Sequence, residues 1–133
     1  MWLFLDTSSR SRLRLALFSQ TGVERLQDDE GERRPLVALL SAFISHRELT
    51  SLTGVCVVKG PGSFSAIRSG VLIANLLSRL YHIPLVGISC DEAVDLALVA
   101  KRVHSRRVGK SKYVAPVYDA EPNITKKGVG RGA

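Results

Sequence analysis

Residues 54–70 read GVCVVKGPGSFSAIRSG, and this stretch leads from an apolar run through a turn with two glycines into a helical pattern. The β-branched residues of 54–59 are typical of a buried strand. Apolar side chains recur at helical spacing over 63–81, which predicts a helix. A strand and a helix joined by a tight glycine turn indicate an α/β fold.

The part of the chain before this unit predicts three strands and a helix. Residues 2–7, 13–19 and 23–27 are short β-type runs separated by turn signals, which predicts an antiparallel meander. The apolar pattern that follows Pro35 predicts a helix over 36–46.

The part after this unit adds a strand and a helix. Residues 85–89 form another apolar run, and Ser89 and Glu92 are spaced as a capping box that opens a helix near 90–103. The predicted order β-β-β-α-β-α-β-α matches a ribonuclease H-like or actin-like (ASKHA) half-domain with a mixed five-stranded sheet and packed helices. We assign the half-domain to residues 1–100, a basic linker to 101–112, and a short closing segment and tail to 113–133.

Composition indicates one compact domain, because 133 residues with 45% apolar content can build a single core. The apolar runs are too short for a membrane span, and the first residues lack the pattern of a signal peptide. We therefore expect a soluble, cytoplasmic protein without a membrane partner. Cys56 and Cys90 lie in or beside apolar runs, so we expect buried, reduced thiols.

The net charge of +7 is concentrated beyond residue 100. Residues 1–100 hold ten Lys or Arg against ten Asp or Glu, whereas the nine basic residues beyond them face only Asp119 and Glu121. Such a tail favours a polyanionic partner, but a solvated linker has the same composition and no aromatic residues are interleaved for base stacking. The candidate nucleic-acid contacts are Lys101, Arg102, Arg106, Arg107, Lys110 and Lys112.

The glycine turn meets neither common phosphate-binding pattern. A P-loop requires a lysine that is absent here, and the dinucleotide fingerprint requires a third glycine where Ser65 stands. What remains is a helix N-terminus with free N–H groups and a Ser63 cap, which can accept an anion weakly. A tight strand-to-helix turn is the simpler interpretation.

The helix at 63–81 carries small side chains at every fourth position, namely Ala66, Gly70, Ala74 and Ser78, and it is apolar nearly all round. One face can cover the sheet. The other face needs a second partner, either the helix at 36–46 or another polypeptide. We predict a helical subunit interface that consists of Leu36, Leu39, Leu40, Phe43, Ala66, Ile67, Gly70, Ile73, Ala74 and Leu77.

Catalytic and metal-binding interpretations lack the residues that their chemistry requires. Ser89 follows a strand as in a nucleophile elbow, but Asp91 replaces the second glycine of that motif. The three histidines are far apart and form no short ligand pair. A nuclease would need Asp6 together with a carboxylate at the end of the fourth strand, where Lys59 and Gly60 stand. We expect no catalytic residue, no cofactor and no metal.

Four stretches resemble the TsaB (YeaZ) family of bacterial tRNA threonylcarbamoyladenosine biosynthesis proteins, in the family's order. They are DTSS at 6–9, KGPGSFSAIRSG at 59–70, HIPLVGISCDEA at 82–93 and APVY at 115–118. Ser65 and Ala66 replace the Thr and Gly of the family's glycine turn. The matching motif residues are Asp6, Thr7, Ser8, Gly60, Pro61, Gly62, Ser63, Phe64 and Arg68.

The resemblance implies a non-catalytic paralogue of the TsaD subunit, which uses ATP and a metal to transfer a threonylcarbamoyl group to a tRNA adenosine. It implies a scaffold that dimerises with the TsaD-type transferase through the helices at 36–46 and 63–81, with a homodimer as an alternative and a TsaE-type ATPase as a further partner. The HxxxH motif of the catalytic paralogue is absent, because Thr50 lies four residues after His46. The family's second half-domain is also missing, so we expect either a naturally compact protein or a truncated sequence.

Three hypotheses from different classes stay open. The first is the scaffold subunit. The second is an enzyme, an actin-like ATPase or a metal-dependent peptidase that uses Asp6. The third is a tRNA-binding module that acts through the basic residues beyond residue 100.

Overall fold

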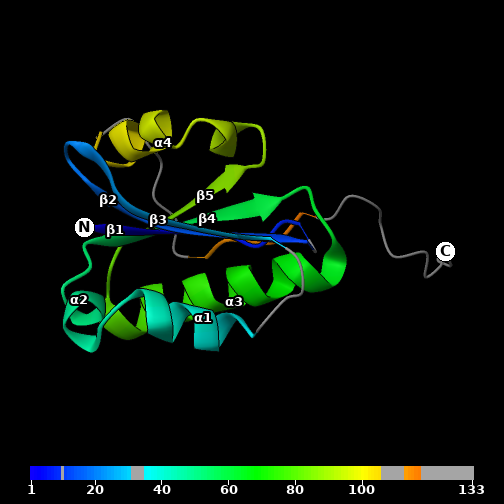
Figure 1. Ribbon diagram of the computed structural model, residues 1–133, viewed down its shortest axis with the longest axis horizontal. Helices are drawn as coiled ribbons and strands as arrows, with labels where there is room; N and C mark the ends of the chain where they lie inside the picture. Colours follow the sequence, from blue (N-terminus) through cyan, green and yellow to red (C-terminus); the bar gives the residue numbers. More distant parts are fainter. Residues whose placement is uncertain (10, 31–34, 106–112, 118–133) are drawn as a thin grey trace, which may run out of the picture.

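The computed structural model describes residues 1–9, 11–30, 35–105 and 113–117. Five strands form one sheet in the order β3-β2-β1-β4-β5 (Figure 1). The strands β1, β2 and β3 form an antiparallel meander, and β4 and β5 add to β1 in parallel. The mixed five-stranded sheet predicted from the sequence is confirmed. The strand bounds are β1 (Trp2–Asp6), β2 (Arg12–Ser19), β3 (Gly22–Glu30), β4 (Gly54–Gly60) and β5 (Leu85–Ser89).

Helices cover both faces of the sheet, because the inner strands β1 and β4 have apolar side chains on both faces. Figure 1 shows α1, α2 and α3 on one side, and the short η1 and α4 on the other. Since β1 and β4 alternate their side chains between two buried clusters, neither strand has a face left for solvent. The helix bounds are α1 (Leu36–Phe43), α2 (His46–Thr50), α3 (Phe64–Tyr81), η1 (Glu92–Val94) and α4 (Leu96–Val103).

The helix predicted over 36–46 is in fact two helices. Ser45 has extended backbone angles, its hydroxyl accepts from the Glu48 N–H, and the Glu48 carboxylate accepts from the Ser45 N–H, which completes a capping box that starts α2. Arg25 of β3 donates to the same carboxylate at 2.7 Å. These hydrogen bonds, that from Arg25 first, lower the pKa of Glu48 to about 2.

Three other predicted boundaries need correction. The strand β3 continues to Glu30 instead of ending at residue 27, because Arg12 pairs with Asp28 across the two strands at 2.6 Å. The predicted capping box of Ser89 and Glu92 is present, but it opens η1, whereas Asp95 caps α4. The helix α4 continues to Val103, so the predicted linker boundary at residue 100 is too early.

The small side chains of α3 face the sheet of the same chain. Ala66, Gly70, Ala74 and Ser78 are all buried, and a Cβ atom at Gly70 would collide with the Oγ1 of Thr7. The stripe therefore lets α3 lie directly on the end of β1. The interface prediction is wrong for the eight residues that are buried inside the chain, namely Leu36, Leu39, Leu40, Phe43, Ala66, Ile67, Gly70 and Ala74. Ile73 and Leu77 are partly buried against the same core.

Residues 113–117 pack on the half-domain without forming a strand. The Asn75 side chain of α3 forms two hydrogen bonds with the backbone of Val114. Its Oδ1 accepts from the Val114 N–H at 2.9 Å, and its amide group donates to the Val114 carbonyl at 2.9 Å. The Val114 side chain lies against Gly87 of β5, and the Val117 N–H donates to the Lys59 carbonyl at 2.6 Å. The segment is therefore docked on the half-domain by two side-chain hydrogen bonds and one backbone hydrogen bond in place of a strand ladder.

Replacement of Gly70 by Ala is expected to destabilise the fold by about 1–3 kcal/mol, because the new methyl group overlaps the buried Thr7 side chain. Helix propensity alone predicts the opposite sign, a gain of about 1 kcal/mol. In a Thr7→Ala background the loss should shrink or reverse. Denaturant unfolding of the unchanged protein, the two single variants and the double variant measures both effects, and an equal loss in both backgrounds would contradict this packing.

Replacement of Asn75 by Leu removes both hydrogen bonds to Val114. We expect faster hydrogen exchange at the Val114 amide, and a loss of about 1–3 kcal/mol of stability because two groups lose their partners. The Val55 amide, which donates to the Pro84 carbonyl inside the sheet, is the internal reference. Leu76→Ala, a change at an exposed neighbour, should leave the Val114 exchange rate unchanged.

Candidate functional site

The two sequence motifs meet at one edge of the sheet, because β1 and β4 are parallel neighbours and both end there. The Ser63 N–H donates to the Ser8 carbonyl at 3.2 Å. A Cβ atom at Gly62 would collide with that same carbonyl, and Gly60 has a φ of 122° with the Val117 carbonyl where its Cβ would stand. The glycines therefore allow three backbone segments to pack together, which is a structural use of the motif.

Ser63 begins α3, but its side chain does not cap the helix. Its backbone has the extended angles of an N-cap residue, and its carbonyl accepts from the Ile67 N–H at 3.0 Å. Its hydroxyl is buried and has no hydrogen-bond partner among the described residues. The predicted Ser63 side-chain cap is wrong, because the hydroxyl makes no hydrogen bond to the first turn of the helix.

Asp6 is held in hydrogen bonds on both carboxylate oxygens. Its Oδ1 accepts from the Ser8 N–H at 3.0 Å and from the Ser8 hydroxyl at 2.6 Å. Its Oδ2 accepts from the Nε and Nη2 of Arg14 at 3.1 and 2.7 Å. Arg14 also donates to the Ala93 carbonyl at 2.9 Å and lies over the ring of Phe4. Asp6 thus fixes the loop after β1 to strand β2 and to η1.

This arrangement leaves little of Asp6 for a cation or a substrate. The Asp6 and Arg14 side chains are each only 13% exposed, so the arginine neutralises the carboxylate in a poorly solvated place. Within the described ranges, no three His, Cys, Asp or Glu side chains gather in a way that could hold a metal ion. The geometry favours a structural role for Asp6.

Replacement of Asp6 by Ala should lower the free energy of unfolding by about 2–3 kcal/mol, because a buried arginine loses its charged partner. The matched change Asp28→Ala breaks the exposed pair with Arg12 and should cost less than about 1 kcal/mol. Thermal or denaturant unfolding measures both. Equal effects of the two substitutions would show that Asp6 is not the structural anchor described.

A family model decides which proteins this chain is related to. The model described as TsaD, tRNA N6-adenosine threonylcarbamoyltransferase, matches residues 29–108, which is more than half of the chain. This chain belongs to the TsaD family. No curated protein matches it.

Solved structures agree with the TsaD-family assignment at the level of the fold. YeaZ from Pseudomonas aeruginosa has 21% sequence identity and a TM-score of 0.58, and the match covers 80% of this chain and 49% of that protein. An uncharacterized protein with similarity to peptidase YeaZ from Pseudomonas aeruginosa has 23% identity and a TM-score of 0.53, with 80% and 48% covered. This chain therefore spans about half the length of these structures. The predicted resemblance to YeaZ is confirmed at the level of the fold, and the ASKHA-type fold is confirmed with it.

In this TsaD-family chain, the exposed side of α3 is a row of leucines that the sequence-based interface left out. Leu72, Leu76 and Leu80 lie four residues apart and are 60%, 53% and 69% exposed. We call these three residues the leucine face. Because an α-helix turns 100° per residue, they lie on the side away from the buried stripe of Gly70 and Ala74. The stripe of small residues could have predicted this face. If that stripe packs on a strand, the leucines on the opposite side of the helix are exposed.

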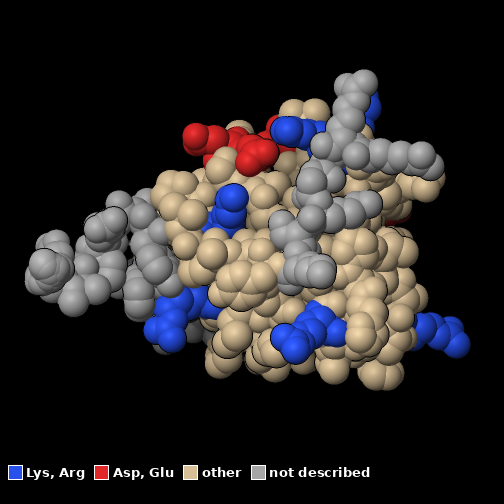
Figure 2. Space-filling view, turned by 180° about the vertical axis from the view of Figure 1, so that it is seen from behind, with Lys and Arg blue, Asp and Glu red and all other residues tan. Residues whose placement is uncertain are grey.

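Two adjoining hollows lie beside the leucine face. Their volumes are about 530 and 600 Å³, and both are lined by Leu72, Asn75 and Tyr113. Arg68, a residue of the family motif, is exposed and lines the first hollow. Figure 2 shows one side of the molecule, which is mostly uncharged, with scattered Lys and Arg residues and a group of acidic residues at the top. The leucine face and the hollows beside it are suited to an apolar contact.

The predicted tRNA contacts are only partly within the described residues. Lys101 and Arg102 are exposed in the last turn of α4, and the Nη1 of Arg102 is 3.7 Å from a carboxylate oxygen of Glu92. The other candidates, Arg106, Arg107, Lys110 and Lys112, lie outside the described residues. No helix in the described part of the chain is long and apolar enough to cross a membrane.

Proposed function

We propose that this chain is a non-catalytic scaffold subunit of the complex that synthesises threonylcarbamoyladenosine in tRNA, and that it docks on a TsaD-type transferase subunit. The observation that carries the proposal is the leucine face, three apolar side chains in one line that are each more than half exposed. A row of this kind on a stable helix is typical of a surface that another protein covers.

The docking surface consists of the leucine face, the hollows beside it and Tyr113, which is 67% exposed. The leucines supply the apolar contact area, and the hollows can receive side chains from a partner. The buried stripe of α3 serves the docking indirectly, because it fixes the helix on the sheet and so presents the leucines at a constant angle. A second copy of this chain is a competing occupant, and a TsaE-type ATPase is a further partner of the assembled complex.

The geometry of Asp6 supports the non-catalytic part of the proposal. An enzyme that binds a metal ion at the end of β1 needs a carboxylate with free oxygens, whereas Arg14 and Ser8 occupy those of Asp6. The alternative of a tRNA-binding module predicts a different salt dependence. The affinity of binding through Lys and Arg falls steeply with salt, whereas the affinity of binding through leucines does not.

Replacement of Leu72 and Leu76 together by Arg should weaken binding to the TsaD-type subunit by about tenfold or more, as expected for central apolar contacts. Both side chains are already exposed, so far-UV circular dichroism and the unfolding midpoint should stay close to those of the unchanged protein. Light scattering of this protein alone and mixed with the transferase subunit gives the masses of the complexes.

The matched control is Val94→Arg, which adds the same charge to an 80% exposed side chain of η1, on the opposite side of the sheet. This variant should bind like the unchanged protein. Full binding by the double leucine variant, or equal weakening by Val94→Arg, would contradict docking through α3. Dissociation of the complex at moderate salt would instead favour binding through a basic surface.

A further inference from the structure

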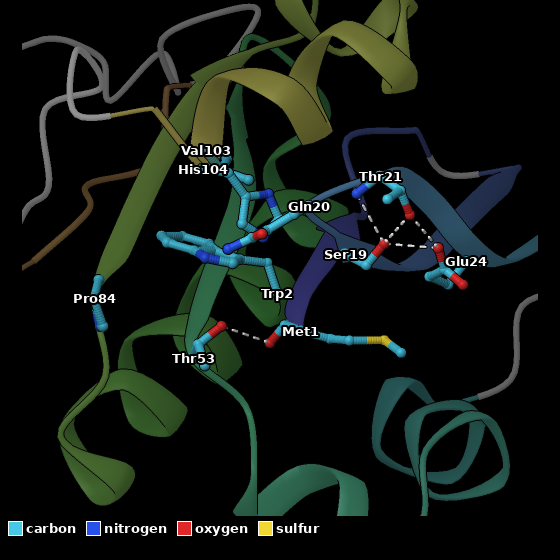
Figure 3. A pocket seen from close by; sticks show the side chains of 10 residues that line it. All are labelled: Met1, Trp2, Ser19, Gln20, Thr21, Glu24, Thr53, Pro84, Val103 and His104. Atoms are coloured by element: carbon cyan, nitrogen blue, oxygen red, sulfur yellow. Dashed lines mark hydrogen bonds between the residues drawn. The ribbon is translucent and has the colours of Figure 1, made fainter.

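Another hollow, of about 710 Å³, lies at the opposite edge of the sheet from the glycine turn. It is formed where β1, β4 and β5 begin, where β2 turns into β3, and where α4 ends, so its walls come from all parts of the half-domain (Figure 3). Of the stretches that resemble the family, only the one at 82–93 reaches it, through Pro84, and no residue of the leucine face lines it. We propose that this hollow binds a small cationic molecule with a planar, amide-bearing end and an ammonium end.

Trp2 supplies an unused hydrogen-bond donor. Its side chain is only 4% exposed, because the indole lies against Gly54, where a Cβ atom would approach the ring to 2.5 Å. Its Nε1–H has no acceptor among the described residues, yet it is not sealed from solvent. A nearly buried indole N–H normally finds an acceptor, and a carbonyl oxygen of a ligand would supply one.

His104 forms the neighbouring wall and fixes the direction of its ring. The Nδ1 lies 2.8 Å from the Ala100 carbonyl, which can only accept, so Nδ1 carries the proton. The other nitrogen of the neutral ring is then an acceptor. The imidazole meets the Trp2 ring edge to face at 6.4 Å, and Figure 3 shows these two rings close to the Gln20 amide. Two aromatic rings and the Pro84 ring suit a flat group.

Glu24 supplies the charge at another part of the hollow. Its Oε2 accepts from the Ser19 hydroxyl at 2.7 Å and from the Thr21 hydroxyl at 3.1 Å. These hydrogen bonds, that from Ser19 first, lower the pKa of Glu24, so it is ionised at neutral pH. Its Oε1 accepts no hydrogen bond from a described residue. Among the described residues that line the hollow, Glu24 is the only Asp, Glu, Lys or Arg, so the part of the hollow beside it favours an ammonium group over phosphates and carboxylates.

The hollow therefore offers a donor beside flat apolar walls and, separately, a carboxylate. The amide carbonyl of a ligand would accept from Trp2, its amide N–H would donate to His104, and its ammonium group would lie at Glu24. This site is independent of the docking proposed for α3, so either proposal can fail without the other.

The protein carries its own reporter for this test, because Trp2 is the only tryptophan of the chain. Titration with 4-(aminomethyl)benzamide should change the Trp2 fluorescence saturably. Its matched anion, 4-carbamoylbenzoate, should bind at least about tenfold more weakly, because a carboxylate replaces the ammonium group opposite Glu24. No saturable change up to the solubility limit of the amine, or equal affinity for the anion, would overturn the proposal.

Two variants assign the effect to this hollow. Glu24→Gln should weaken binding of 4-(aminomethyl)benzamide about tenfold, the order expected when a hydrogen bond to a charged group is lost. Glu30→Gln makes the same change at an exposed position of the same strand and should leave the affinity unchanged. Equal affinities of the unchanged protein and the Glu24 variant would overturn the proposal, and far-UV circular dichroism verifies that both variants are folded.

Discussion

The close approach of α3 to the end of β1 is the constraint on which the rest of the structure depends. Thr7 is fully buried, and only a residue without a side chain fits above it at position 70. This contact sets the rotation of α3 about its own axis. Once Gly70 faces the sheet, the geometry of the helix directs Leu72, Leu76 and Leu80 to the outside. A packing requirement inside the half-domain thereby determines which side chains are offered to a partner.

The edge of the sheet where β1 and β4 end is closed by the chain's own polar groups. The pair of Asp6 and Arg14 holds the loop after β1, and the glycines of the turn leave room for the carbonyl groups of Ser8 and Val117. In this TsaD-family chain, which spans about half of the similar solved structures, the loop after β1, the glycine turn and the segment that contains Val117 are packed against one another at this edge. The open hollows lie elsewhere, beside the leucine face and at the other end of the strands.

The elements could be predicted from the sequence because strands and helices leave local patterns, but the choice of a helix face could not. An α3 that is apolar nearly all round gives no periodic signal for its inner side, and only the distant Thr7 decides it. The strand predicted at 23–27 stops short of the acidic end of β3, because Asp28 pairs with Arg12, which is sixteen residues away in the sequence. The hollow around Trp2 and His104 could not be predicted from a sequence motif, because the residues that line it are far apart in the sequence.

The two hydrogen bonds between Asn75 and Val114 have a consequence for the length of the chain. They fix residues 113–117 beside β4 and β5 through contacts that do not involve the preceding residues. The entropy of closing a loop grows slowly, so each doubling of the chain between Ser105 and Tyr113 would cost only about 0.6 kcal/mol. This attachment therefore tolerates inserted sequence of widely different size.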